Sequence, residues 1–440
     1  MTEPASRPWV RPAFMKWSLA AFLLLIPVVA HAVWAYVEAE HFRRTVAEIR
    51  SRAEPVTLGE IRPRPVHDEG FRSDRYYRAA AVLASNRPQE QSFFERVRAA
   101  ERKGDWPAGL ADDMKRQIGE REDALQLLDR AAPLTFEGFS LGTEGASLAL
   151  FPLARLAGLR TMSLILEGRG DPATASLYAE LRLRPVVEWA WPIFRAPVEE
   201  VDRVGRVLSS THPTSTALAR IARALADLDR DNALKQWFMR RRAMLFNSTF
   251  GDGPFPRWAM TGAVFDVVGL RGAVLGRFLG QPWFESQMRG RAERLSVVIA
   301  ALDQEWPERA DAVTRAYDGL SPAPNDPLLR RPDVSMSKQI VDDLALVRAA
   351  RVAVAIERFR RDHAERMPAR LDDLIPDYLD AVPVDPYSGW PLLLRAEPRS
   401  YAVYSVGPNR RDDNGDFSLL RFSQGVRESR DVGLRIQRRS

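Results

Sequence analysis

The fold of the C-terminal quarter of this 440-residue chain is decided by residues 367–409, MPARLDDLIPDYLDAVPVDPYSGWPLLLRAEPRSYAVYSVGPN. The prolines break the stretch into a short helix at 370–378, a turn, and strand-like runs at 392–394 and 401–406. Just before it, residues 340–359 carry apolar side chains at helical spacing and charges on the other face. The sequence therefore predicts one long helix followed by a small β-sheet.

The order of these elements resembles the globular domain of the major pseudopilins of type II secretion systems. The resemblance covers about a quarter of the chain, residues 336–420, and it implies a small extracytoplasmic α+β module whose long helix packs on the sheet. The chain lacks the basic leader, ending in Gly and followed by Phe and a Glu, with which pseudopilins begin. We therefore do not expect cleavage by a prepilin peptidase or polymerisation as a pilin.

The resemblance also implies a calcium site. In that family the loop after the final strand binds calcium, and the matching place holds Asp412, Asp413, Asn414 and Asp416. Clustered hard oxygen ligands suit Ca²⁺, and the ion would offset the repulsion between the carboxylates. The alternative is an ordinary turn, because Asp-Asn-Gly sequences form Asx turns readily. Both interpretations stay open at this point.

An apolar segment near the N-terminus decides the compartment. Residues 17–37 are apolar except for Ser18 and His31, and about 20 such residues span a bilayer as a helix. Arg7, Arg11 and Lys16 precede the segment and favour a cytoplasmic N-terminus. The segment therefore predicts a signal-anchor in a bacterial inner membrane, with the bulk of the chain in the periplasm.

Two alternatives to this anchor remain. Ala30-His31-Ala32 has the small-x-small form of a signal-peptide cleavage site, which would release the chain after Ala32. A buried core helix is the other alternative. Trp34 and Tyr36 favour the uncleaved anchor, because aromatic side chains gather at membrane interfaces.

The middle of the chain, from Arg72 to Gly319, predicts helices almost throughout. Residues 153–167 and 172–184 form the clearest pair, a helical hairpin similar to one tetratricopeptide unit, with Asp171 as N-cap of its second helix. No 34-residue period recurs, so we expect an irregular stack of hairpins. Residues 261–280, in which Gly272, Gly276 and Gly280 recur every four residues, favour a tightly packed helix over a membrane-surface helix.

These features predict a mainly α-helical protein with a small α+β module at its end. The predicted segments are a cytoplasmic N-terminus (1–16), a signal-anchor (17–37), a juxtamembrane segment (38–71), a helical domain (72–319), a linker (320–335), the module (336–420) and a basic tail (421–440). The linker is the clearest boundary, because several prolines fall within it. The whole arrangement resembles membrane-anchored bacterial proteins with a tetratricopeptide-like helical middle.

Composition excludes several classes of function. The chain is 45% hydrophobic and 28% charged, as globular proteins are, and it has no cysteine for disulfides, thiolate metal sites or nucleophiles. The net charge is +6, and only five of the 64 basic residues are lysines. The arginines alternate with acidic residues along predicted helices, so we expect them on solvated helix faces. We expect no nucleic-acid partner, because no binding motif accompanies them.

No catalytic motif stands out. Residues 138–142, GFSLG, match the G-x-S-x-G nucleophile elbow, but that motif needs a buried strand before it, and residues 132–137 do not predict one. The five histidines show no metal-ligand spacing: His31, His41, His67, His212 and His363. We therefore predict no catalytic residue. The expected function is an anchored envelope scaffold or interaction protein that binds another protein and is related to secretion. The alternative is an enzyme or small-molecule binder with its site in a groove of the helical domain.

Overall fold

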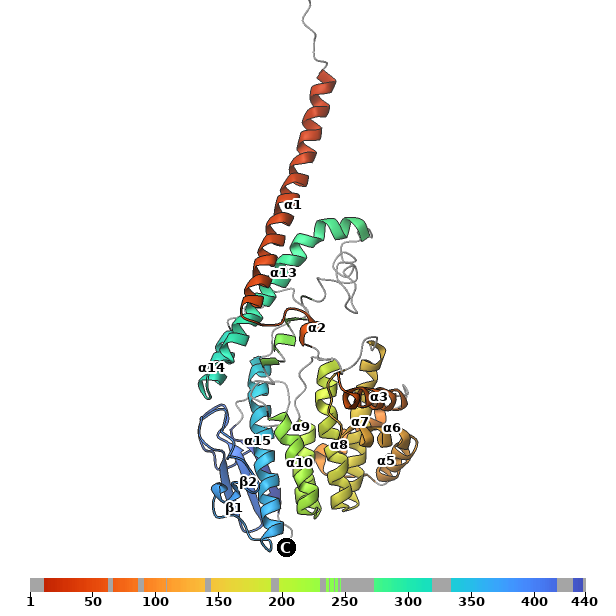
Figure 1. Cartoon of the computed structure of the whole chain (residues 1–440), viewed down its shortest axis with the longest axis vertical. Helices are drawn as coiled ribbons and strands as arrows, with labels where there is room; N and C mark the ends of the chain where they lie inside the picture. The colour runs from red at the N-terminus through yellow and green to blue at the C-terminus, as the bar shows by residue number, and fades with distance from the viewer. Residues whose placement is uncertain are drawn as a thin grey trace, which may run out of the picture. The chain divides into compact units, whose positions relative to one another are not determined.

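A computed structural model describes residues 12–61, 66–85, 91–107, 109–138, 144–190, 198–229, 235–236, 238–240, 242–243, 246, 273–318, 334–417 and 430–437. The described chain is mainly helical, with one small antiparallel sheet of three strands (Figure 1). The predicted fold class is confirmed at this level. The chain divides into two compact units, residues 1–60 with 241–296 and residues 61–240 with 297–440.

The first unit is built on two long helices. They are α1 (Pro12–Ser51) and α13 (Ala273–Ala301), whose residues up to 296 belong to this unit. Their contact carries polar links, with Arg289 Nη2 3.3 Å from Glu38 Oε2 and Thr45 Oγ1 donating to Glu293 Oε1 at 3.2 Å. The apolar side chains buried there are Phe42, Val46, Ile49, Val56, Phe246, Met288 and Ala292.

The two apolar segments predicted in this unit, residues 17–37 and 261–280, are only partly described by the structure. No helix among the described residues is both long and apolar enough to cross a membrane. The predicted signal-anchor at 17–37 lies within α1, but its side chains before Leu25 lie outside the described part. Of residues 261–280, only the helical backbone from Ala273 onward is described.

The second unit contains a stack of helices. The short helix α2 (Leu58–Ile61) lies at the division between the two units. The helices that follow in the second unit are, in chain order, α3 (Asp68–Leu83), α4 (Gln91–Lys103), α5 (Leu110–Gly119), α6 (Glu122–Ala131), α7 (Glu144–Leu166), α8 (Gly170–Ala190), α9 (Val198–Ser210), α10 (Ser215–Leu228), α14 (Glu308–Asp318) and α15 (Val334–Asp362). The predicted hairpin is confirmed, because α7 and α8 lie against each other along their length. The prediction of Asp171 as N-cap of α8 is wrong, because α8 begins at Gly170. The Asp171 carboxylate instead accepts hydrogen bonds from the N–H and the hydroxyl of Thr214, in the turn between α9 and α10.

The sheet follows α15 and the short 3₁₀ helix η3 (Leu371–Leu374). Strands β1 (Leu393–Glu397), β2 (Ser400–Ser405) and β3 (Val432–Gln437) pair antiparallel in the order β1-β2-β3. β2 matches the predicted run at 401–406 to within one residue at each end, whereas β1 shares only Leu393 and Leu394 with the predicted run at 392–394. β3 corrects it, because this strand lies in the predicted basic tail (421–440) and buries Val432, Leu434 and Ile436.

One continuous core joins the predicted helical domain to the predicted module. Apolar side chains of α4, α7, α8, α9 and α10 pack in the same cluster as those of α15 and the sheet. The predicted linker at 320–335 lies outside the described residues up to 333, and α15 begins at Val334. The module therefore does not form a separate core in the second unit.

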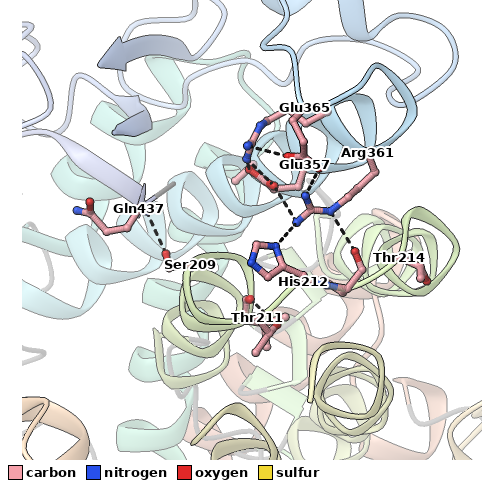
Figure 2. Close-up of polar contacts among 12 residues, drawn as sticks. Ser209, Thr211, His212, Thr214, Glu357, Arg361, Glu365 and Gln437 are labelled. Atoms are coloured by element: carbon pink, nitrogen blue, oxygen red, sulfur yellow. Dashed lines mark hydrogen bonds and ion pairs between the residues drawn. The ribbon is translucent and has the colours of Figure 1, made fainter. Parts of the chain in front are cut away.

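Polar contacts fasten this junction at the turn between α9 and α10. Figure 2 shows Arg361 of α15 reaching that turn, where its Nε donates to Pro213 O at 3.2 Å and its Nη2 lies 3.4 Å from His212 Nδ1. Gln437 of β3 donates its backbone N–H to Ser209 Oγ at 3.2 Å. These contacts hold both the long helix and the last strand against the helical stack.

The motif VPVDPY at 382–387 owes its place to one buried carboxylate. Asp385 is 1% exposed, and its oxygens accept from Ser405 Oγ at 2.6 Å and from Val406 N at 3.0 Å, at the end of β2. The same carboxylate accepts from Tyr387 N at 2.8 Å, while the Tyr387 hydroxyl donates to Asp342 of α15 at 2.6 Å. The turn thus links the end of β2 to the long helix.

Candidate functional site

The predicted calcium ligands lie in the loop that follows β2. Asp412 Oδ1 accepts from the Tyr404 hydroxyl at 3.0 Å and from Asn414 N at 2.8 Å. Asp413 Oδ2 accepts from Asn409 Nδ2 at 2.7 Å, and Asp416 Oδ2 pairs with Arg430 Nη1 at 2.6 Å. Each of the three carboxylates is therefore directed at its own protein partners.

A residue that sequence reasoning missed holds this loop in shape. Asp431 is fully buried, and its carboxylate accepts from Asp413 N at 3.2 Å and from Gly415 N at 2.6 Å. Burial raises the pKa of Asp431, and the neighbouring Asp412 and Asp413 raise it further, while the two backbone hydrogen bonds oppose the shift. No motif marks Asp431 in the sequence, because it lies just before a strand that was predicted as a tail.

As arranged, these residues do not form one oxygen cage. Within the described part of the chain, no group of three or more His, Asp or Glu residues is placed to hold a metal ion. Calcium binding at Asp412, Asp413, Asn414 and Asp416 stays a prediction of the resemblance. A calcium titration followed by thermal melting tests it: binding would raise the melting temperature, and no shift at millimolar calcium would refute the site.

The other sequence candidates do not assemble into a catalytic group. Of the G-x-S-x-G match, only Gly138 is described, and residues 139–142 lie outside the described part. His67 pairs with Glu137, whose carboxylate also accepts from the backbone N–H groups of Val66 and His67. His363 Nδ1 lies 2.9 Å from Phe359 O, and its ring stacks on the Phe359 ring. These contacts give both histidines local structural roles.

A buried ion cluster connects four helices of the second unit. Arg203 of α9 is 7% exposed and pairs with Glu180 of α8, which is 4% exposed, and with Glu101 of α4, whose Oε1 lies 3.2 Å from Arg203 Nε. Thr161 of α7 donates to Glu180 Oε2 at 3.1 Å. A Cβ on Gly158 would lie 2.9 Å from Arg203 Cζ, so glycine leaves room for the guanidinium.

Burial dominates the electrostatics of this cluster. It raises the pKa of Glu180 to about 7 although the Arg203 guanidinium opposes the shift. The adjoining cavity measures about 40 Å³ and is lined by both apolar and charged side chains. That volume holds about one water molecule, so we assign the cluster to folding and not to a ligand.

A wide groove on the same helical hairpin has a different character. It has a volume of about 900 Å³ and is lined by α7, α8, α10 and the end of α6. Five arginines and only two aspartates line it: Arg160, Arg169, Arg182, Arg220, Arg223, Asp129 and Asp227. The alanines at positions 132, 175, 179 and 224 leave space between these long side chains.

Three of the five arginines are held by protein partners. Both terminal nitrogens of Arg160 donate to the Asp129 carboxylate, at 2.8 and 2.7 Å. Arg182 Nη1 donates to Asp227 at 2.7 Å, and its other nitrogens donate to two backbone carbonyls. Arg169 lies 3.4 Å from Glu167 in an exposed pair.

The remaining two arginines of the groove differ from these three, because they have no described partner. Arg220 and Arg223 stand three residues apart on α10, are exposed, and make no hydrogen bond or ion pair with any residue that the structure describes. Residues at this spacing share one face of a helix, so two like charges are held side by side. The groove therefore presents two uncompensated guanidinium groups.

A chain of hydrogen bonds runs from the groove to the buried cluster. Arg160 Nε donates to Ser176 Oγ at 2.9 Å, and Ser176 Oγ lies 2.9 Å from Thr161 Oγ1. Thr161 in turn donates to Glu180 at 3.1 Å. One side chain of the groove wall is thus connected to the least exposed acid of the cluster.

Sequence reasoning expected the arginines on solvated helix faces, and the structure corrects this for several of them. The buried arginines are Arg184, Arg203, Arg242, Arg291, Arg348 and Arg360, each less than 9% exposed. Arg348, for example, pairs with Asp229 at 3.0 Å and donates to Val384 O at 2.6 Å. A spacing rule within one helix finds the pair of Arg360 with Glu357, three residues apart on α15, but it does not find the pair of Arg348 with Asp229, which lies outside that helix.

Comparison with known proteins adds no relative: the chain matches no protein family, no curated protein and no solved structure.

Proposed function

We propose that this protein is a scaffold or interaction protein of the bacterial cell envelope, anchored in the inner membrane by residues 17–37. In this proposal the bulk of the chain lies in the periplasm and binds another protein. The resemblance of residues 336–420 to pseudopilins supports a partner in a secretion system.

The observation that carries the anchor is the exposure of apolar side chains on α1. Leu25, Ile26, Val28, Val29 and Val33 are each at least 50% exposed, and they point to more than one side of the helix because several are adjacent in sequence. A helix that is apolar all round needs an apolar environment. A bilayer supplies one, and Trp34 and Tyr36 then lie where interfacial aromatic side chains gather.

The observation that supports a binding role is the arginine-lined groove. Its volume of about 900 Å³ is that of a ligand-binding cleft, whereas the cavity beside the buried cluster is far smaller. The two uncompensated arginines of the groove are exposed at its wall, so a partner can reach them. Among the described residues, this surface combines the volume and the exposed charges of a binding site.

The anchor is tested with the full chain in cells. Val28→Arg combined with Val29→Arg should release the protein from alkali-washed membranes, because an arginine at the centre of a span costs roughly 2.5–3.5 kcal/mol. Ala47→Arg, at an exposed position of the same helix beyond the segment, is the control and should be retained. Wild-type protein found in the soluble fraction would refute the anchor.

The interaction role is tested separately. Crosslinking in living cells, followed by affinity purification from membranes and mass spectrometry, should recover a specific envelope protein. Secretion components among the recovered proteins would support the secretion-related part of the proposal. Recovery of no specific protein would refute the interaction role.

A further inference from the structure

We infer that the arginine-lined groove between α8 and α10 binds an acidic peptide segment of a partner protein, with Arg220 and Arg223 as its principal contacts. This inference rests on the proposed interaction role and names the chemistry of the partner. It follows from the charges in the groove, the apolar residues of its lining and the exposure of the two arginines.

The charges of the groove leave an excess of positive charge. Its lining has five arginines against two aspartates, and Arg169 shares Glu167, beside the groove, with Lys115. Arg160 and Arg182 are neutralised by Asp129 and Asp227. The excess is therefore concentrated on Arg220 and Arg223, whose mutual repulsion is unfavourable in the free protein. A carboxylate between them removes that repulsion and forms charge-assisted hydrogen bonds with both.

The floor of the groove favours a peptide over a small inorganic anion. The lining, called the floor here where it is apolar, also contains Leu164, Pro172, Ala175, Ala179 and Ala224, which are mostly small. Such a floor accommodates the backbone and short apolar side chains of a peptide, while the arginines hold its acidic side chains. A bare phosphate ion would use the arginines and leave the apolar floor in contact with water.

The same composition disfavours nucleic acid. Single strands are held by aromatic side chains on which successive bases stack, together with a basic groove that follows the backbone. Tyr178 is the one aromatic residue among the described lining residues, and its hydroxyl donates to Ala132 O at 3.3 Å. The groove therefore provides no series of stacking surfaces for bases.

The matched control for this groove lies on another helix. Arg72 and Arg75 of α3 also stand three residues apart, are exposed, and make no hydrogen bond or ion pair with a described residue, but they do not line the groove. Reversing either pair changes the net charge by the same amount. A difference between the two reversals therefore reports the position of the arginines and not the total charge.

The experiment uses the full chain in nanodiscs of neutral lipid. A fluorescent dodecapeptide of alternating Glu and Ala is titrated by anisotropy, and the peptide with Gln in place of Glu serves as a neutral reference. We expect the Glu peptide to bind and the Gln peptide to bind at least about tenfold more weakly. Arg220→Glu with Arg223→Glu should weaken the Glu peptide by about tenfold or more, whereas Arg72→Glu with Arg75→Glu should leave its affinity within about twofold.

Further measurements decide between the possible occupants. Arg220→Lys with Arg223→Lys should retain most of the affinity and separates loss of charge from loss of folding. Equal loss in the α3 reversal, equal binding of the Gln peptide, or no binding of the Glu peptide would overturn the inference. Displacement of the peptide by equimolar inorganic phosphate, or stronger binding of anionic vesicles than of peptide, would also overturn it.

Failure here is distinguishable from failure of the proposed function. If the groove binds no acidic peptide while crosslinking still recovers a specific envelope protein, the interaction role stands and another surface carries it. If the peptide binds but crosslinking recovers no protein, the chemistry of the groove stands and the interaction role in the cell does not.

Discussion

The buried ion cluster and the arginine-lined groove are built on the same two helices, α7 and α8, but they treat charge in opposite ways. In the cluster, Arg203 is surrounded by Glu180 and Glu101, and water is almost excluded. In the groove, Arg220 and Arg223 are exposed and have no acidic partner among the described residues. Mutual neutralisation is typical of charges that serve folding, whereas the exposed positive charge of the groove is the observation on which the acidic-peptide inference rests.

Substituting the central cation of the cluster is the strongest way to break this comparison. Arg203→Met leaves Glu180 and Glu101 without their shared cation, and removing one partner of a buried pair typically costs about 3–5 kcal/mol. We expect this loss in the free energy of unfolding at pH 8, measured by denaturant titration, and a smaller loss at pH 5, where Glu180 is protonated.

The control for this substitution is an exposed ion pair next to the cluster. Arg98 Nη2 lies 3.7 Å from Glu199, and the two side chains are 43% and 45% exposed. Arg98→Met should therefore cost less than about 1 kcal/mol. Equal losses for the two substitutions would show that Arg203 is no more important to folding than a surface arginine.

The titration of Glu180 makes the stability of the chain depend on pH, which gives a second test of the contrast between the cluster and the groove. Because the pKa of Glu180 is raised to about 7 in the folded chain, the native state keeps a proton that the unfolded state has already released above its ordinary pKa. This group therefore lowers the free energy of unfolding as the pH rises from about 5 to 7, by at most about 3 kcal/mol. Above pH 7 the contribution stays constant.

The variant that isolates this effect is Glu180→Gln. Its stability relative to wild type should improve as the pH rises from 5 to 8, because the variant has no proton to release. Urea unfolding of both proteins at a series of pH values measures the difference. A difference that stays the same over this range would place the pKa of Glu180 near that of an ordinary glutamate.

The groove arginines should give the smallest effect on stability. Arg220→Ala with Arg223→Ala removes two exposed side chains that have no described partner, so we expect a change within about 0.5 kcal/mol. Relief of the repulsion between them acts in the stabilising direction. A loss of several kcal/mol in thermal or denaturant unfolding would show that these arginines serve folding, and the contrast between the two regions would disappear.

Local sequence signals were enough to predict some elements. The hairpin of α7 and α8 follows from two apolar periodicities separated by the Gly-Arg-Gly turn at 168–170, and β1 and β2 follow from short apolar runs bounded by prolines and turns. β3 was missed because its apolar residues alternate over only six positions, and charged residues surround it. Its strand character depends on β2, which supplies the other half of its hydrogen bonds.

The charged regions could not be predicted in the same way. Arg203 and Glu180 are 23 positions apart in the chain, and no helical spacing relates them. Burial of an arginine depends on which helices pack around it, so identical residue types appear in the cluster and in the groove. For the loop at 412–416, the sequence showed the acidic residues but not Asp431, which holds the loop backbone from the position just before the neighbouring strand β3.

In the hydrogen-bond chain from Arg160 to Glu180, every donor points in the same direction, from the groove towards the buried cluster. The Thr161 hydroxyl has one proton, which it donates in a hydrogen bond to an ionised Glu180. In its contact with Ser176, Thr161 must therefore be the acceptor. Ser176 then has no proton left and accepts from Arg160. When Glu180 gains a proton, the Thr161 hydroxyl can donate to Ala157 O instead, 3.1 Å away, while its oxygen still accepts from Ser176. A single proton in the core thus decides which acceptor the Thr161 hydroxyl uses, and it leaves the hydrogen bond from Arg160 to Ser176 in place.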